Sequence, residues 1–309
     1  MIASMDVLRQ YSTRTLSFDA DALNAIIGAM NSYARHGVQH IWGVPWKRSS
    51  ADYSPGLKDI LSTSRSVRRD IDIALLWNHR QPSIRRNGFP SWSPLGWKTP
   101  IQWSGFLVGR GTGNYVTPEA ITVRVNSDKG FHKLYDPANP EECTPEGLSH
   151  YLKIEARTAM CNLQFQTARM PREEDFDPQP GIRMSLGDGW DAIMEVRWDL
   201  PPDKENETLL KCVLLPAADF TQSTVNELSA HVFILEHHGN HYERIGMTRL
   251  PARFDRMRCF APFFGFQNES GRVYAAYDEL PSDVEKYIQS VMVDHWWWNY
   301  FEPDTIILG

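Results

Sequence analysis

The most constraining feature of this sequence is a run of apolar residues at every second position on both sides of a tight turn. The alternation covers residues 182–186, stops at Asp188-Gly189, and resumes over residues 190–198. A period of two places alternate side chains on the same face of a strand. Asp-Gly is a favoured pair for the two-residue turn of a β-hairpin. The sequence therefore predicts an antiparallel hairpin with one buried face over residues 182–198.

Other segments have the length and apolar content of strands. "HVFILE" and "YERIGM" flank "HHGNH" and predict a second hairpin with its turn near Gly239-Asn240. "IWGVPW" (41–46) predicts a turn. "IDIALLW" has the length of a buried strand. Strands are predicted within the following segments: 71–77, 121–125, 152–156, 208–216 and 305–309.

Two segments show helical periodicity instead. Residues 20–36 place apolar side chains on one face, and Gly37 can supply the left-handed residue that ends such a helix. Gly28 in the middle of this helix lowers helix propensity, which predicts that another element packs closely over it. A capping box of Ser282 and Glu285 precedes a second apolar stripe, which predicts a C-terminal helix over about 283–297.

Many strand segments and two helices place the chain in the α+β class. We expect a β-rich fold of mostly antiparallel strands and hairpins. The 309 residues, of which 42% are hydrophobic, are enough to bury a large core. No long linker divides the chain, so residues 1–309 are expected to form a single domain.

Tryptophan is abundant, with 11 residues in the chain, and the stretch "FPSWSPLGW" at 89–97 combines two of them with turn-forming residues. A buried tryptophan contributes a large apolar area and one N–H group that needs a partner. We interpret Trp77, Trp92, Trp97 and Trp103 as a structural aromatic cluster that joins the first helix to the sheet. Arg85-Arg86 are expected to lay their side chains over its edge. A surface for a ligand or a partner remains the alternative.

Charge and cysteine content limit the class of partner and the compartment. The net charge of −6 argues against a surface that follows nucleic-acid phosphates. No apolar run is long enough to span a bilayer, and the N-terminus lacks a secretory pattern. The four cysteines lie far apart, so neither a zinc motif nor a disulfide framework is predicted; they are Cys143, Cys161, Cys212 and Cys259. We expect a cytoplasmic protein.

No motif gives a firm basis for catalysis or cofactor binding. "GRGTGN" (109–114) leads into a strand-like segment and lacks the lysine of a phosphate-binding loop. "HHGNH" (237–241) could hold zinc if its imidazoles converged, but it is interpreted as the polar loop of a hairpin. "GLSHY" (147–151) lacks the closing glycine of a nucleophile elbow. We therefore predict no catalytic residues, no metal ligands and no cofactor, and we leave the binding residues unknown.

The order of several short blocks resembles one protein family. In chain order the blocks are "YSTRTLSFDADALNAIIGAM", "WGVP", "DIALLW", "RR" followed by "FPSW", and "GW". This order is similar to the region that follows the HET domain in fungal HET-domain (heterokaryon incompatibility) proteins. The blocks cover residues 11–103, with similar segments at "YERIGM" and "TIILG" near the end. The chain departs from the family at Pro94-Leu95-Gly96, where members usually have a second tryptophan and Ala-Gly.

The resemblance implies a role in non-self recognition that ends in programmed cell death after hyphal fusion. In the family, the death-inducing activity belongs to the HET domain, which the resemblance implies is absent from this chain. A non-enzymatic regulatory or interaction region, with an unknown protein partner, is therefore our main hypothesis. An uncharacterised hydrolase or NAD-consuming enzyme, and a truncated gene product without independent activity, are the alternatives. The resemblance implies no catalytic residue for this part of the chain.

Overall fold

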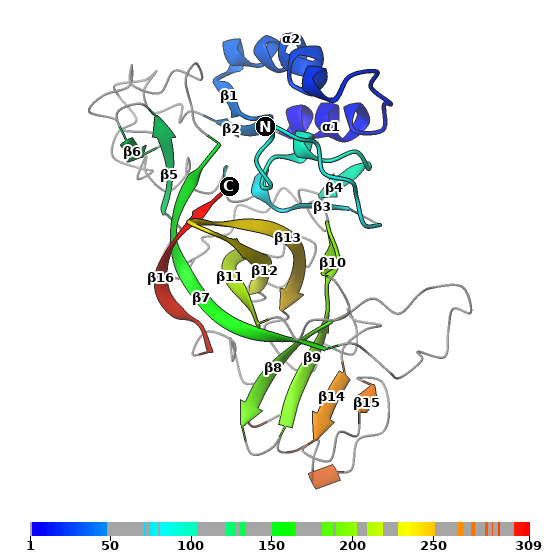
Figure 1. Cartoon of the computed structure of the whole chain (residues 1–309), viewed down its shortest axis with the longest axis vertical. Coiled ribbons are helices and arrows are strands. Elements are labelled where there is room, and N and C mark those ends of the chain that lie inside the picture. Colours follow the sequence, from blue (N-terminus) through cyan, green and yellow to red (C-terminus); the bar gives the residue numbers. More distant parts are fainter. Residues whose placement is uncertain are drawn as a thin grey trace.

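The protein is analysed as a computed structural model (Figure 1). The structure describes the following residues: 2–47, 71, 74–79, 81–103, 122–127, 130–133, 150–164, 181–187, 190–202, 209–218, 228–250, 265–268, 273–275, 282–283, 286, 290 and 300–309. Figure 1 shows short helices at one end of the long axis, a curved set of strands in the middle, and β8, β9, β14 and β15 at the other end.

The N-terminal part consists of short helices followed by a small hairpin. Its elements, in chain order, are α1 (Ile2–Tyr11), the 3-10 helix η1 (Asp19–Ala22), α2 (Asn24–Ser32), the 3-10 helix η2 (Ala34–His36), β1 (Val38–Ile41) and β2 (Val44–Lys47). β1 and β2 pair antiparallel around the turn predicted in "IWGVPW".

The predicted helix over 20–36 is helical, but it is divided. A 3-10 turn precedes α2 and another follows it, and Gly37 ends the segment with φ 74° in the left-handed region, as predicted. The prediction for Gly28 is wrong, because a Cβ atom at that position would meet no atom within 4 Å. α1 was not predicted.

Most strands belong to one large, mostly antiparallel sheet. In the described residues it has 12 strands, and its main path runs β10-β13-β12-β11-β7-β8-β9-β14-β15. The strands are β5 (Thr122–Ser127), β6 (Gly130–Lys133), β7 (Leu152–Gln164), β8 (Gly181–Gly187), β9 (Trp190–Glu195), β10 (Arg197–Trp198), β11 (Leu209–Ala218), β12 (Leu228–His238), β13 (His241–Leu250), β14 (Gly265–Asn268), β15 (Val273–Ala275) and β16 (Glu302–Leu308). The strand-rich, antiparallel character predicted from the sequence is confirmed.

Both predicted hairpins are present, but the first is shorter than the predicted range 182–198: its second strand ends at Glu195, and residues 197–198 form β10, which pairs with β13. The predicted turn residues Asp188 and Gly189 lie outside the described residues. β8 pairs with β9, and β12 pairs with β13 across the turn at Gly239 and Asn240. In β8 and β9, period-two alternation favours the register that buries the apolar set, whereas the register of β12 and β13 follows from their two-residue turn. The predicted strands at 121–125, 152–156, 208–216 and 305–309 correspond to β5, β7, β11 and β16.

β16 closes part of the sheet into a ring. It pairs antiparallel with β7 over residues 302–308, and it pairs parallel with β13 where Leu308 lies beside Tyr242. Because β7, β11, β12 and β13 are also paired in that order, these five strands form a closed ring. Figure 1 shows the C-terminus near the start of β13.

Two hydrophobic cores lie on opposite faces of the shared strands. In β11, Cys212 and Leu214 belong to the first core, whereas Val213 and Leu215 belong to the second. β12 alternates in the same way. The first core packs against β8 and β9, and the second packs against the segment around residues 71–76. Burial on both faces explains the continuous apolar run at residues 232–235 of β12 and the run at residues 212–215 of β11.

Two predicted elements near residues 71–77 and 283–297 differ from the structure or lie largely outside the described residues. The segment 71–77 was predicted as a strand, which is wrong for its first part: Ile71, Ala74 and Leu75 are helical, and strand β3 begins only at Trp77. A short, wholly buried apolar run does not distinguish helix from strand. Most of the predicted helix over 283–297 lies outside the described residues, although residues 282, 283, 286 and 290 are helical.

Candidate functional site

A two-stranded sheet places polar side chains between the N-terminal helices and the large sheet. It pairs β3 (Trp77–His79) with β4 (Ile101–Trp103), so Asn78 lies opposite Gln102. All three residues of β3 are buried. Asn78 accepts hydrogen bonds from Arg197 Nη1 at 2.9 Å and from Gln102 Nε2 at 3.1 Å. The bond from Arg197 connects β3 to β10 of the large sheet, and the bond from Gln102 connects β3 to β4.

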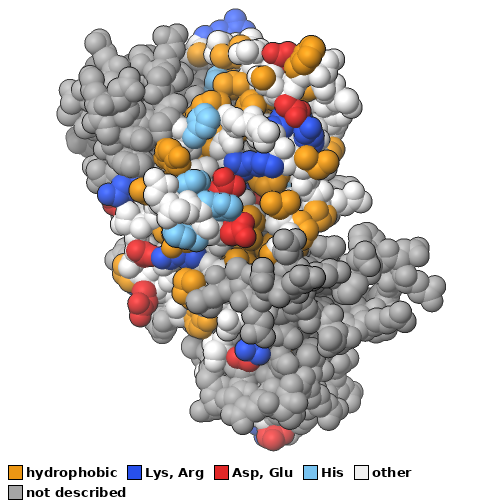
Figure 2. All heavy atoms as spheres, viewed as in Figure 1, with side chains coloured by type: hydrophobic (Ala, Val, Ile, Leu, Met, Phe, Trp, Pro, Cys, Tyr) orange, Lys and Arg blue, Asp and Glu red, His pale blue; other side chains and the backbone are white. Residues whose placement is uncertain are grey.

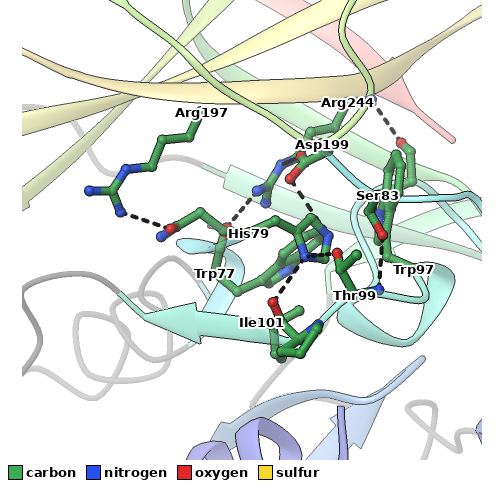
Figure 3. Close-up of polar contacts among 12 residues, drawn as sticks. Trp77, His79, Ser83, Trp97, Thr99, Ile101, Arg197, Asp199 and Arg244 are labelled. Atoms are coloured by element: carbon green, nitrogen blue, oxygen red, sulfur yellow. Dashed lines mark hydrogen bonds and ion pairs between the residues drawn. The ribbon is translucent and has the colours of Figure 1, made fainter. Parts of the chain in front are cut away.

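The centre of the site is a fully buried ion pair between Arg244 of β13 and Asp199, which follows β10 (Figure 3). Arg244 Nε donates to Asp199 Oδ2 at 2.8 Å, and both side chains are 0% exposed. The other two guanidinium nitrogens donate to the carbonyl oxygens of Leu75 and Trp77. The guanidinium carbon also lies 3.7 Å from the centre of the Trp77 ring and 4.6 Å from that of Phe233. Arg244 therefore links three segments that are distant in sequence.

Burial lowers the pKa of Arg244, and the carboxylate of Asp199 opposes this shift. An arginine in a protein nevertheless keeps its proton. The pair is therefore a true ion pair in the interior, where the cost of desolvation is repaid only if hydrogen bonds satisfy both partners. The two carbonyl acceptors of Arg244 help to meet that requirement.

His79 extends the cluster toward the surface. Its Nδ1 lies 2.9 Å from Thr99 Oγ1 and 3.3 Å from the carbonyl oxygen of Pro100. Its Nε2 lies 3.8 Å from Asp199 Oδ1, and these two buried atoms have no hydrogen-bond partner in the described residues. Burial lowers the pKa of His79 below its ordinary value of 6.5, partly opposed by Asp199, so the ring is neutral at pH 7. Arg244, Asp199, His79 and Thr99 thus form a line from the interior to a half-exposed hydroxyl.

Two of the four tryptophans of the predicted aromatic cluster contact this line: Trp77 packs against Arg244 and His79, and Trp97 packs against His79. Trp77, Trp92 and Trp97 are at most 2% exposed, and Trp103 is partly buried. Each indole N–H donates to a backbone carbonyl oxygen; the acceptors are those of Trp92, His150, Ser91 and Ala74, respectively.

The indole rings also connect the cores. Trp77 and Trp97 pack with the N-terminal helices, whereas Trp92 packs in the second core of the large sheet. The His79 ring lies between Trp77 and Trp97, with ring centres 5.3 and 5.7 Å apart.

The turn within "FPSWSPLGW" is a short 3-10 helix, η4 (Pro94–Gly96), capped by the Ser93 side chain. A Cβ atom on Gly96 would lie 2.8 Å from the carbonyl oxygen of Pro90, so the turn requires glycine there. Arg85 lies over the Trp97 ring at 5.0 Å, as expected from the sequence. Arg86 instead points inward, where it donates to the carbonyl oxygens of Leu95 and Trp97 and pairs with Asp19 at 3.4 Å.

Hydroxyl, imidazole and carboxylate in a row are the components of a hydrolytic relay. Two features oppose that chemistry here. The Asp199 carboxylate is already neutralised by Arg244. The backbone N–H groups of Lys98 and Thr99 donate to Ser83 Oγ at 3.2 and 3.0 Å, so they are not free to stabilise an oxyanion beside the hydroxyl. The geometry suits a structural joint better than a reactive centre.

Sequence reasoning missed Asp199, Arg244 and His79. They lie 45 residues or more apart, so no local spacing connects them. Arg244 follows Glu243 in a strand segment of mixed polarity, "YERIGM", so its burial had no local signal. The motif "HHGNH" lies at the β12–β13 turn, as predicted, and "GRGTGN" lies outside the described residues.

In the part of the chain that the structure describes, Cys161 and Cys212 are free and buried. Among the helices described, none is both long and apolar enough to cross a membrane. Comparison with known proteins found no matching family model, no matching curated protein and no matching solved structure.

Proposed function

We propose that this chain is a non-enzymatic regulatory or interaction region of a HET-type protein, linked to non-self recognition and programmed cell death in fungi. Support from the sequence is the ordered set of blocks over residues 11–103. Support from the geometry is the Arg244–Asp199 pair, which holds β3 against β13 with every guanidinium nitrogen engaged. Polar groups that could react are used to hold the structure together.

The proposal includes a single α+β domain with a C-terminal helix over about 283–297, a cytoplasmic location and an unknown protein partner. The resembling blocks contribute Trp77, Trp92 and Trp97, which lie where the helices meet the sheet. A regulatory region must present a stable surface to its partner. The buried Arg244–Asp199 pair supports this, because it holds the N-terminal part rigidly against the large sheet.

Expression of the full chain in a filamentous fungus with a working incompatibility system tests the proposal. We expect unfused hyphae to stay alive and the fraction of dying fused cells, scored with a vital dye, to change. An Asp199→Asn variant, which weakens the joint, is the control that shows whether the effect needs the folded chain. Unchanged death in fused cells, or death in unfused hyphae, contradicts the proposal.

A hydrolase is the second candidate, because Thr99, His79 and Asp199 are aligned. It predicts that the purified chain cleaves activated esters and that Thr99→Val abolishes the cleavage. The regulatory proposal predicts no turnover that depends on Thr99. The same ester assay, run on the wild-type chain and on the Thr99→Val variant, separates the two candidates.

A further inference from the structure

The tip of the β12–β13 hairpin brings two histidines and two glutamates to one face. In the register of the hairpin, His238 lies opposite His241. Two residues further from the turn on each strand, Glu236 lies opposite Glu243. Residues two apart in a strand share a face, so all four side chains project from the same side. Side chains directly opposite have Cβ atoms about 4.5–5.5 Å apart. The sequence E-H-H-G-N-H-Y-E therefore places four metal-ligating groups on one face, in two cross-strand pairs separated by the His237–Tyr242 pair.

Each histidine already lies beside a carboxylate on its own strand. His238 Nε2 is 2.9 Å from Glu236 Oε2, and His241 Nε2 is 3.7 Å from Glu243 Oε1. The two imidazole rings are stacked, with centres 6.2 Å apart. Figure 2 shows histidine side chains in pale blue close to acidic side chains on the face where this hairpin ends. Two His–Glu pairs thus lie side by side on an accessible surface.

The glutamate rung also favours a cation. Glu236 and Glu243 are directly opposite each other, and like charges at such positions destabilise a hairpin. A dication between the two strands would offset that repulsion, and the four donors would supply its ligands.

We propose that Glu236, His238, His241 and Glu243 bind one divalent cation of the zinc class. Imidazole nitrogen selects Zn²⁺, Ni²⁺ or Cu²⁺ over Ca²⁺ and Mg²⁺, which prefer all-oxygen sites. As the side chains stand, no three such donors in the described residues are arranged around a metal position. Binding therefore requires side-chain rotation. The side chains of His238 and Glu236 are 45% and 38% exposed and can rotate, while the His241 ring is held 5.2 Å from that of Tyr151.

Zinc titration of the full chain by calorimetry at about pH 7.5, above the ordinary pKa of imidazole, tests the site. We expect one zinc ion per chain, and His238→Ala and Glu236→Gln should each weaken binding by at least about tenfold. His237→Ala is the matched control, because that ring faces the other side of the same strand and packs 4.9 Å from the Tyr242 ring. The control should bind zinc as tightly as the wild type.

Two outcomes overturn the proposal. One is a wild-type chain that binds no zinc at this pH. The other is a His238→Ala variant that binds as tightly as the wild type, which would place the zinc elsewhere. His237 and His238 are exposed and Glu236 is half-buried, and a melting curve without metal verifies that each of the three variants is folded.

Discussion

Replacement of Asp199 by asparagine leaves the guanidinium of Arg244 inside the protein without its counter-charge. Both side chains are 0% exposed, and the Nε–Oδ2 distance is 2.8 Å. Removing one partner of a buried ion pair costs about 3–5 kcal/mol, because the remaining charge is uncompensated. The asparagine side chain would keep a carbonyl oxygen near Arg244 Nε, so Asp199→Asn belongs at the lower end of that range and Asp199→Ala at the upper end.

Urea denaturation followed by circular dichroism measures this cost as a change in the free energy of unfolding. Asp6→Asn is the matched control, since it breaks an exposed i,i+3 pair with Arg9 in which the side chains are 56% and 53% exposed. That control should change stability by less than about 1 kcal/mol. An Asp199→Asn variant as stable as Asp6→Asn would refute the reasoning.

A double-mutant cycle tests whether the two charges act as a unit. Arg244→Met alone should be destabilising, because it removes the donors to the carbonyl oxygens of Leu75 and Trp77 and leaves Asp199 unpaired. The double variant should cost less than the sum of the single variants, by on the order of 1–3 kcal/mol. Strict additivity would show that the pair is not coupled.

Three other predictions concern the packing around this joint. Trp92→Ala should cost about 3–5 kcal/mol of stability, because the indole is 0% exposed in the second core; an unchanged melting temperature would contradict its role as core. Gly28→Ala should stabilise the protein by about 0.5–1 kcal/mol in urea denaturation, since no atom lies within 4 Å of the new Cβ; a loss of stability would mean that α2 is contacted there. Burial lowers the pKa of His40, His79 and His150 below 6.5, so the unfolded chain binds more protons and stability should fall as the pH drops below about 6.5. Urea midpoints measured on both sides of that pH check the sign, and a more stable protein at the lower pH would reverse it.

The strands were predictable because their pattern is local. Residues 182–198 alternate with a period of two around Asp188-Gly189, and β8 and β9 follow that pattern. The β12–β13 hairpin was predictable from its turn residues in the same way. Burial of Ile71 and of residues 74–77 was also visible in the sequence, but their conformation was not, because an apolar run that is buried all round carries no period.

The polar site was not predictable because it is assembled from distant segments. His79, Asp199 and Arg244 come from three elements that adjoin only after β3 docks on β10 and β13. The ring closure by β16 is equally non-local, since it pairs residues 302–308 with residues 152–158. The tryptophans could be assigned to a cluster from composition and spacing. The acceptors of their N–H groups could not be predicted, because they are backbone carbonyl oxygens 6 to 58 residues away in the sequence.

Amide hydrogen exchange tests the central claim, that residues 77–101 are joined to the large sheet as one unit, most directly. Ser83 N–H donates to the carbonyl oxygen of Asp199 at 2.8 Å, and Arg86 N–H donates to that of Gly96 at 2.7 Å. If the joint is structural, these amides exchange with the same free energy of opening as those of β12 and β13, and Asp199→Asn lowers that value for both groups. Fast exchange at Ser83 and Arg86 while β12 and β13 remain protected would contradict the account.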